Sequence, residues 1–286
     1  MSGLFREELV QTVTDDGVLH AGAIWHPVGA VRRGPTLLWT HGLTGSWDEP
    51  HAVLIGRALA SRGFTVVAGN GRGHHVGTRL FGPSIAPFAG GALWELFSQA
   101  DRDIGAWISF AHERLGKPVA LCGHSYGAIK SVTYVSAHAD QRVIGLCSAS
   151  GPFRPRSRLL PEVGEVARAR DLVAAGRGEE IVRFTTPSGE ARTVGAAALV
   201  DRADHLPDTY GADSVDSPVS RVRCPLLALY GGDEPHIGTA ADLATIRRNA
   251  TGAPRVETAL IDGADHVYTG RVAALCDVLE RWMMGL

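Results

Sequence analysis

Lysine is almost absent from this sequence of 286 residues. Only Lys117 and Lys130 occur among 28 basic residues, and the others are arginine. We interpret this as a bias of genomic composition and not as a binding signal. Basic and acidic residues nearly balance, at 28 against 30, so the net charge is −2. This balance gives no electrostatic reason to expect nucleic acid or an anionic membrane as a partner.

Cysteine and long apolar runs are scarce as well. The four cysteines form no Cys-x-x-Cys pair, which argues against a zinc site. Three of them lie in or beside apolar runs, as buried thiols commonly do, and a reducing cytoplasm fits them best. No stretch approaches the ~18 apolar residues of a membrane helix. The N-terminus also lacks the apolar segment of a signal peptide. We therefore expect a cytoplasmic protein with no membrane span and no metal.

Nucleotide-binding signatures are missing too. No Walker A sequence occurs, and the glycine-rich stretch at residues 69–74 does not have the Gly-x-Gly-x-x-Gly spacing of a dinucleotide fold. We interpret that stretch as a loop beside the rim of an active site, and we expect no cofactor. Internal repeats and low-complexity segments are likewise absent.

The sequence does contain a regular alternation of strand and helix signals. It opens with a predicted hairpin, residues 11–14 and 18–25 around an Asp-Gly turn. Strands are then expected at 36–40, 64–68, 119–122, 143–147, 226–230 and 256–261, and helices at 48–62, 93–115, 126–138, 239–249 and 271–284. Continuously apolar strands are typical of parallel sheets that are covered on both faces. The pattern predicts a doubly wound α/β fold with a mostly parallel sheet.

The alternation is interrupted after residue 151. Residues 152–219 are rich in Arg, Glu, Gly and Pro, with one helix expected at 162–175 and a hairpin formed by 181–184 and 191–194. The simplest interpretation is one core domain, residues 1–151 and 220–286, that carries the insertion 152–219 over its loop edge.

Residues 123–127 carry the strongest chemical signal, Gly-His-Ser-Tyr-Gly, between a predicted strand and a predicted helix. This is the Gly-x-Ser-x-Gly pattern of a nucleophile elbow. The chain must turn within a few residues and hold Ser125 in a strained conformation, so side chains two positions away on either side would clash. A tight turn with a solvent-exposed serine is the plainer alternative. The context favours Ser125 as a nucleophile.

A serine nucleophile needs a base, and we expect it to be His266. His266 follows the last predicted strand, at the carboxyl edge where its imidazole can reach the elbow. A polar surface loop is the alternative there. His236 ranks behind it because it shares the loop of the candidate acid. Other histidines are interpreted as surface or strand-end residues: His20, His26, His51, His112 and His138.

The acid that would orient the base is expected to be Asp233. It follows the predicted strand 226–230 through two glycines and lies 33 residues before His266. That gap leaves room for one helix and one strand between acid and base. A plain turn residue is the alternative, since Gly-Gly-Asp also suits a turn. Asp265 is a rival, but a neighbour in sequence rarely turns its carboxylate onto the same imidazole. Glu234, Asp262 and Asp213 are weaker candidates.

Two main-chain groups are expected to stabilise the negative charge of a tetrahedral intermediate. Residues 41–45, His-Gly-Leu-Thr-Gly, follow the first core strand, and we assign the oxyanion hole to the backbone N–H groups of Leu43 and Tyr126. A plain glycine turn is the alternative for residues 41–45.

Taken together, these segments resemble the α/β-hydrolase superfamily over nearly the whole chain. They are His41-Gly42 after one strand, Arg72-Gly73-His74 after the next, the elbow at Ser125, the acid after a later strand, and His266. Many relatives carry Asp-x-Arg-Gly-x-Gly, where this sequence has Asn70 and His75, which affects the shape of that loop. The serine argues against the branches that use an aspartate nucleophile. The resemblance implies that residues 152–219 are a lid.

Three functions are compatible with these residues. The first is hydrolysis of a carboxylic ester or thioester by an acyl-enzyme on Ser125. The second is an acyltransferase or cyclase that passes the same acyl group to another acceptor. The third is a non-catalytic binding module on this scaffold. The expected partner is a small-molecule acyl substrate, free or carrier-bound. The sequence leaves the oligomeric state open, with a homodimer as one option.

Residues that could bind the substrate have two interpretations each. The aromatic residues Trp47, Phe81, Phe88, Phe153 and Phe184 could line an apolar pocket or pack in the core and lid. The arginines at positions 154, 156 and 158 could bind a carboxylate or a phosphopantetheine arm, or form a solvated face.

Overall fold

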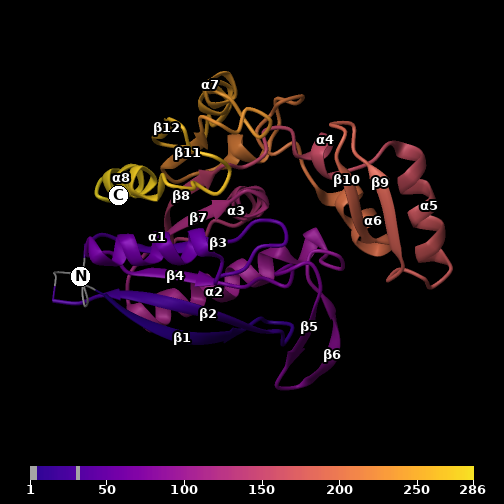
Figure 1. The fold of residues 1–286 in the computed structure, drawn as a ribbon, viewed down its shortest axis with the longest axis horizontal. Helices are drawn as coiled ribbons and strands as arrows, with labels where there is room; N and C mark the ends of the chain where they lie inside the picture. The colour runs from indigo at the N-terminus through magenta and orange to yellow at the C-terminus, as the bar shows by residue number, and fades with distance from the viewer. Residues whose placement is uncertain (1–4, 30–32) are drawn as a thin grey trace.

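The computed structural model describes residues 5–29 and 33–286. Residues 1–4, which belong to the N-terminal stretch judged not to be a signal peptide, lie outside this range. Across the described residues, eight strands form one sheet in the order β1-β2-β4-β3-β7-β8-β11-β12 (Figure 1). Its strands are β1 (Phe5–Val13), β2 (Leu19–Pro27), β3 (Thr36–Thr40), β4 (Val66–Gly69), β7 (Val119–His124), β8 (Val143–Ala149), β11 (Leu226–Gly231) and β12 (Val256–Ile261).

The sheet is parallel from β4 to β12, while β2 runs antiparallel to both β1 and β4. The expected hairpin and the mostly parallel, doubly wound sheet are therefore confirmed. The helices of this core are α1 (Pro50–Ser61), α2 (Ala100–Leu115), α3 (Tyr126–Ala137), α7 (Ala240–Asn249) and α8 (Val272–Met283).

Two apolar cores lie on the two faces of the sheet. Successive residues of a strand alternate between them: Leu37 and Trp39 belong to the core with α1 and α8, and Leu38 belongs to the core with α2, α3 and α7. Because side chains alternate along a strand, a strand buried on both faces must be apolar at every position. This explains the continuous apolar runs in the sequence.

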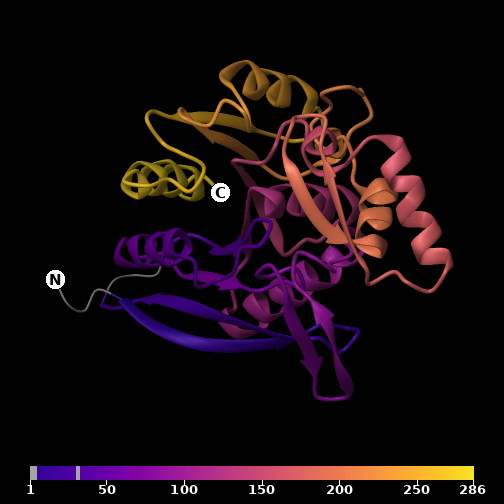
Figure 2. The ribbon, with the colours of Figure 1, turned by 45° about the vertical axis from the view of Figure 1, so that its right-hand side comes forward.

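The segment between β8 and β11, which was predicted to be an insertion and is called so below, contains the expected helix and hairpin. Its elements are α4 (Pro155–Leu159), α5 (Val163–Ala174), the antiparallel pair β9 (Ile181–Thr185) and β10 (Ala191–Gly195), α6 (Ala196–His205) and the 3₁₀ helix η2 (Pro218–Arg221). Both views show α4 to α6 grouped at the side of the molecule away from α8 (Figure 2). Helix α6 is tied to the core where Ser98 N donates to Asp201 Oδ2 at 3.1 Å and Arg202 Nη2 donates to Ala92 O at 2.8 Å.

Helices α4 and α6 of the insertion were not expected from the sequence, and two segments of the core also differ from the expectation. Residues 78–90 form a second hairpin, β5 (Thr78–Gly82) with β6 (Ile85–Gly90), which extends away from the sheet (Figure 1). The helix expected from residue 93 begins later, after the 3₁₀ helix η1 (Phe97–Gln99). Residues 91–95 instead form turns that bond to neighbouring loops, as where Leu93 N donates to Val76 O at 3.0 Å. Tertiary contacts thus override the helical periodicity of this stretch.

No helix in the described part of the chain has the length and apolar character needed to cross a bilayer.

Candidate active site

Ser125 lies in a tight turn between β7 and α3, with φ 55° and ψ −120°. A positive φ is strained for a residue with a side chain, and such strain is found where function requires it. The flanking glycines are required by close backbone approaches. A Cβ on Gly123 would lie 2.4 Å from the carbonyl oxygen of Gly127, and one on Gly127 would lie 2.4 Å from that of His41. The steric reason inferred from the sequence for both glycines therefore holds.

The imidazole of His266 contacts the hydroxyl of Ser125. Its Nε2 lies 2.9 Å from Ser125 Oγ, and its Nδ1 lies 2.6 Å from Oε2 of Glu234. Since a carboxylate only accepts, Nδ1 carries the hydrogen and Nε2 is free to accept the serine proton. The chain thus holds the tautomer that a general base needs. The side chain of Glu234 is fully buried, whereas that of His266 is 31% exposed.

The acid beside His266 is Glu234, and the expectation for Asp233 is corrected. Asp233 is exposed, and its backbone N–H donates to Ala264 O at 2.9 Å. That bond fixes the strand exit so that the next residue, not Asp233, turns inward. The other candidate acids do not fit the role better. Asp265 accepts hydrogen bonds from Val267 N and Thr269 N, and Asp262 and Asp213 are exposed.

The buried carboxylate of Glu234 has partners for both oxygens. Its Oε1 accepts from Gly231 N at 2.6 Å and from the hydroxyl of Ser150, which lies 2.6 Å from the phenol oxygen of Tyr268. Ser150 and Tyr268 both have left-handed backbones, with φ 51° and 59°. A buried carboxylate is costly unless its lone pairs are bonded, so these contacts explain how Glu234 is tolerated in the interior. No sequence pattern that we recognised pointed to Ser150 or Tyr268.

His124, next to Ser125, supports the loop that carries His266. Its Nε2 donates to the backbone oxygen of His266 at 2.7 Å, and its ring stacks on Trp39 with the centroids 5.6 Å apart. Burial, together with the nearby His266 and His51, holds the pKa of His124 well below its usual value. The ring is therefore neutral, and it fixes the backbone of His266 without adding charge to the site.

The main chain of residue 42 lies directly against Ser125. A Cβ on Gly42 would be 2.9 Å from Ser125 Cβ and 3.3 Å from its Oγ. Tyr126 is the first residue of α3, where backbone N–H groups have no partner within the helix. Both segments that were expected to supply oxyanion donors, at Leu43 and Tyr126, thus adjoin Ser125; the donor role itself stays a prediction.

A family model described as the alpha/beta hydrolase family matches residues 37–278. The chain belongs to this family. The match spans the elbow, Glu234 and His266, and it confirms the resemblance drawn from the motifs. A comparison with curated proteins finds no match.

Three solved structures that share the fold of this alpha/beta hydrolase differ from it widely in sequence. Est1E from Butyrivibrio proteoclasticus, solved with ferulic acid bound, is 16% identical with a TM-score of 0.64, covering 96% of this chain and 98% of its own. GrgF from a Penicillium species is 12% identical with a TM-score of 0.70, covering 97% and 98%. A monoglyceride lipase from Saccharomyces cerevisiae is 14% identical with a TM-score of 0.68, covering 99% and 96%. At such identities these likenesses establish the fold alone.

Several substrate-binding candidates of this alpha/beta hydrolase have structural partners. Arg156 donates to Leu206 O and Ala203 O at the end of α6, and Arg158 donates to His236 O and pairs with Glu190. The bonds of Arg156 and the pair Arg158–Glu190 therefore hold the insertion together, and the bond from Arg158 to His236 O joins it to the core. Arg154 is exposed and pairs with Asp213. Among the aromatic candidates, Phe153 and Phe184 belong to the core with α2, α3 and α7, Trp47 packs against the core with α1 and α8, and Phe81 and Phe88 are exposed.

Within residues 5–29 and 33–286, no group of three or more His, Cys, Asp or Glu side chains is arranged to hold a metal ion.

Proposed function

We propose that this alpha/beta hydrolase cleaves carboxylic esters or thioesters of small acyl substrates through an acyl-enzyme on Ser125. The observation that carries the proposal is the chain of contacts from Ser125 Oγ to His266 Nε2 and from His266 Nδ1 to Glu234 Oε2, at 2.9 and 2.6 Å. It joins a nucleophile, a base and an orienting acid on three separate loops. Structurally similar proteins include an esterase domain and a monoglyceride lipase, which agrees with this proposal.

The reaction proceeds in two halves. Ser125 Oγ attacks the carbonyl carbon while His266 Nε2 takes its proton, and Glu234 stabilises the resulting imidazolium. The imidazolium then gives its proton to the leaving alcohol or thiol, which departs as the acyl-enzyme forms. Water attacks the acyl-enzyme in the second half, losing its proton to His266, and Ser125 is regenerated with release of the acid.

The developing oxyanion is stabilised by the backbone N–H groups of Leu43 and Tyr126. Gly42 allows the main chain to approach Ser125, because a Cβ there would lie 2.9 Å from that of the serine. Tyr126 adds the positive end of the α3 dipole. Donors of this kind contribute most when they are fixed before the reaction begins.

Residues 152–219 act as the lid of this site in our proposal, on the core domain 1–151 and 220–286. Their attachment near residues 92–98, through Asp201 and Arg202, supports this role. The four cysteines are free thiols, three of them buried, which supports a cytoplasmic location.

Turnover of matched oxygen esters and thioesters with acyl chains of graded length tests the function. We expect Ser125-dependent release of the free acid, and Ser125→Ala should abolish it while the circular dichroism spectrum and melting temperature stay unchanged. Product masses identify the acyl acceptor: an acylated alcohol or amine, or a ring, in place of the acid would show transfer or cyclisation. Full activity of the Ser125→Ala variant would refute the proposal.

A further inference from the structure

The side chain of His41 is buried and bonded at both ring nitrogens. Gly71 N donates to Nε2 at 2.9 Å, and Nδ1 lies 2.8 Å from the carbonyl oxygen of Gly42. A backbone N–H can only donate and a carbonyl can only accept. The ring is therefore neutral, with its hydrogen on Nδ1, and it donates to Gly42 O.

The bond from His41 acts on the peptide unit that carries a proposed oxyanion donor. The carbonyl of Gly42 and the N–H of Leu43 are the two ends of one planar peptide group. A hydrogen bond that fixes the direction of the oxygen therefore also fixes the direction of the N–H. It further polarises the amide, because hydrogen bonds in series strengthen each other. The imidazole can thus orient the donor without touching the substrate.

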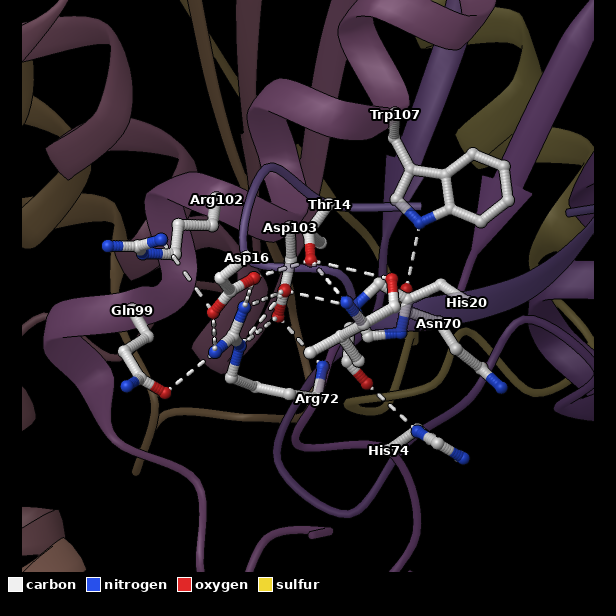
Figure 3. Close-up of polar contacts among 12 residues, drawn as sticks. Thr14, Asp16, His20, Asn70, Arg72, His74, Gln99, Arg102, Asp103 and Trp107 are labelled. Atoms are coloured by element: carbon white, nitrogen blue, oxygen red, sulfur yellow. Dashed lines mark hydrogen bonds and ion pairs between the residues drawn. The ribbon is translucent and has the colours of Figure 1, made fainter. Parts of the chain in front are cut away.

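The other nitrogen of His41 rests on a loop that a buried ion-pair network holds. Asp103 accepts from Arg72 N at 2.7 Å and from Arg72 Nε at 3.0 Å, and His20 Nε2 lies 2.9 Å from the same carboxylate. Figure 3 shows Asp103 between Arg72 and His20, with Asp16 and Gln99 on the far side of the guanidinium. The loop that presents Gly71 N is thereby fixed.

Gly71 fits closely between this network and the imidazole. A Cβ there would lie 3.2 Å from Asp103 Oδ2 and 3.7 Å from His41 Nε2. The contacts form a continuous path from Asp103 to residues 71–72, then to His41, and then to the peptide of Gly42 and Leu43.

The protonation states along this path are stable near neutral pH. Burial, with the positive Lys130 nearby, lowers the pKa of His41 to about 3. Burial alone would raise the pKa of Asp103, but His20 and Arg72 outweigh it and hold that pKa well below its usual value. Near neutral pH, His41 therefore stays neutral with its hydrogen on Nδ1, and Asp103 keeps its charge.

We propose that His41 is a positioning residue that aims the Leu43 N–H at the oxyanion, anchored through Gly71 and Arg72 by Asp103. This inference rests on the proposed function, because it concerns the donor of that reaction. His41 acts through the peptide, because both of its ring nitrogens are bonded to backbone groups, Gly42 O and Gly71 N.

Two substitutions separate the two bonds of the ring. In His41→Asn the amide nitrogen occupies nearly the place of Nδ1 and can still donate to Gly42 O. In His41→Gln the amide lies nearer the place of Nε2, so it can accept from Gly71 N but loses the bond to Gly42 O. We expect kcat to fall about 10- to 100-fold in His41→Gln, less than the loss of a whole oxyanion donor, with KM almost unchanged. His41→Asn should recover most of kcat.

The affinity for phenylboronic acid provides a second readout, since its adduct with a serine mimics the tetrahedral intermediate. It should fall in His41→Gln by the same factor as kcat/KM, because oxyanion contacts act on the transition state and not on the ground state. Asp103→Asn tests the path without altering the imidazole, and it should lower kcat and boronate affinity in parallel but by a smaller factor. His112→Gln, on the exposed end of α2, is the control for replacing a histidine.

The outcomes are distinguishable. Equal losses in His41→Asn and His41→Gln, or a rise in KM without a fall in kcat, would show a merely structural role and overturn the inference. If His41→Gln does not fold, unchanged kcat and boronate affinity in Asp103→Asn would overturn it equally. Failure of the proposed function would show differently, as native protein without Ser125-dependent turnover.

Discussion

At the residue scale, the carboxylate of Glu234 decides how the imidazole of His266 is used. Its Oε2 accepts a hydrogen bond from His266 Nδ1, with the two atoms 2.6 Å apart, and the side chain of Glu234 is fully buried. An amide at position 234 could present its N–H₂ to Nδ1 and favour the wrong tautomer, with the hydrogen on Nε2. The base would then be unable to accept the proton of Ser125.

Glu234→Gln and Asp233→Asn form a matched pair that tests this assignment. We expect Glu234→Gln to lower kcat by roughly 10³- to 10⁴-fold, as tautomer inversion does in serine proteases. Asp233→Asn should stay within about twofold of the native protein, because surface substitutions rarely perturb a site. Steady-state kinetics on one ester checks both. The reverse order of effects would restore Asp233 as the acid and contradict the structure.

The sequence could locate the candidate nucleophile and the candidate base, but not the carboxylate that contacts His266. Ser125 has a motif with a steric cause, and His266 stands alone at the exit of the last strand. Asp233 and Glu234 are adjacent acids, and only the direction of the backbone after β11 separates them. That direction depends on the bond from Asp233 N to Ala264 O, a residue 31 positions away. Local sequence carries no signal for such a contact.

At the element scale, helix α6 joins the insertion to the core. Asp201 accepts from both the backbone and the hydroxyl of Ser98, and Arg202 lies over the ring of Tyr126, with its guanidinium carbon 5.6 Å from the ring centroid. Tyr126 follows the nucleophile directly. The insertion therefore contacts a residue whose backbone N–H we assign to the oxyanion hole.

Asp201→Ala should loosen α6 without unfolding the core. Two charge-assisted hydrogen bonds disappear, each worth about 1.5 to 3 kcal/mol when desolvated and less here, because their donor residue Ser98 is exposed. We expect faster amide hydrogen exchange in residues 196–205 and unchanged exchange in α8, measured by mass spectrometry. Asp201→Asn, which keeps an acceptor, should lie between. Amide exchange that becomes faster throughout the core, or that does not change in α6, would contradict the role of Asp201 as an anchor.

The strands and helices of the core could be predicted from the sequence, because burial on one or two faces requires apolar residues at a regular spacing. The hairpin β5–β6 did not, since its 13 residues include Gly82, Pro83, Pro87 and Gly90 and resemble a loop. Residues 93–96 have apolar spacing that fits a helix, but Gly91 with φ 91° and bonds to residues 72 and 75–76 hold them in turns.

At the scale of the whole molecule, neutral histidines are buried around the site. Burial lowers the pKa of His41 to about 3 and that of His51 to about 4, from ordinary values of 6.5. Between pH values equal to these lowered pKa values and pH 6.5, both histidines are protonated in the unfolded chain but stay neutral in the folded chain. Folding stability therefore rises with pH across this window and is lost as pH falls through it.

Urea unfolding between pH 7.5 and pH 4 tests this linkage. His41 alone accounts for a loss of about 3 kcal/mol by pH 4, and other titrating groups modify the total. We expect the free energy of unfolding to begin to fall near pH 6.5. His51→Gln should make that decline less steep, because the variant lacks one group that binds a proton in the unfolded chain but not in the folded chain. A free energy of unfolding that is constant or rises toward pH 4 would contradict the linkage.

The central claim is that Ser125 is a nucleophile activated by His266 and Glu234. Labelling with a fluorophosphonate probe, followed by intact-mass and peptide analysis, tests it most directly. We predict one adduct per chain at Ser125, a labelling rate reduced by orders of magnitude in Glu234→Gln, a native rate in Asp233→Asn, and no adduct in Ser125→Ala. An unlabelled native protein, or an adduct that persists in Ser125→Ala, would contradict the claim.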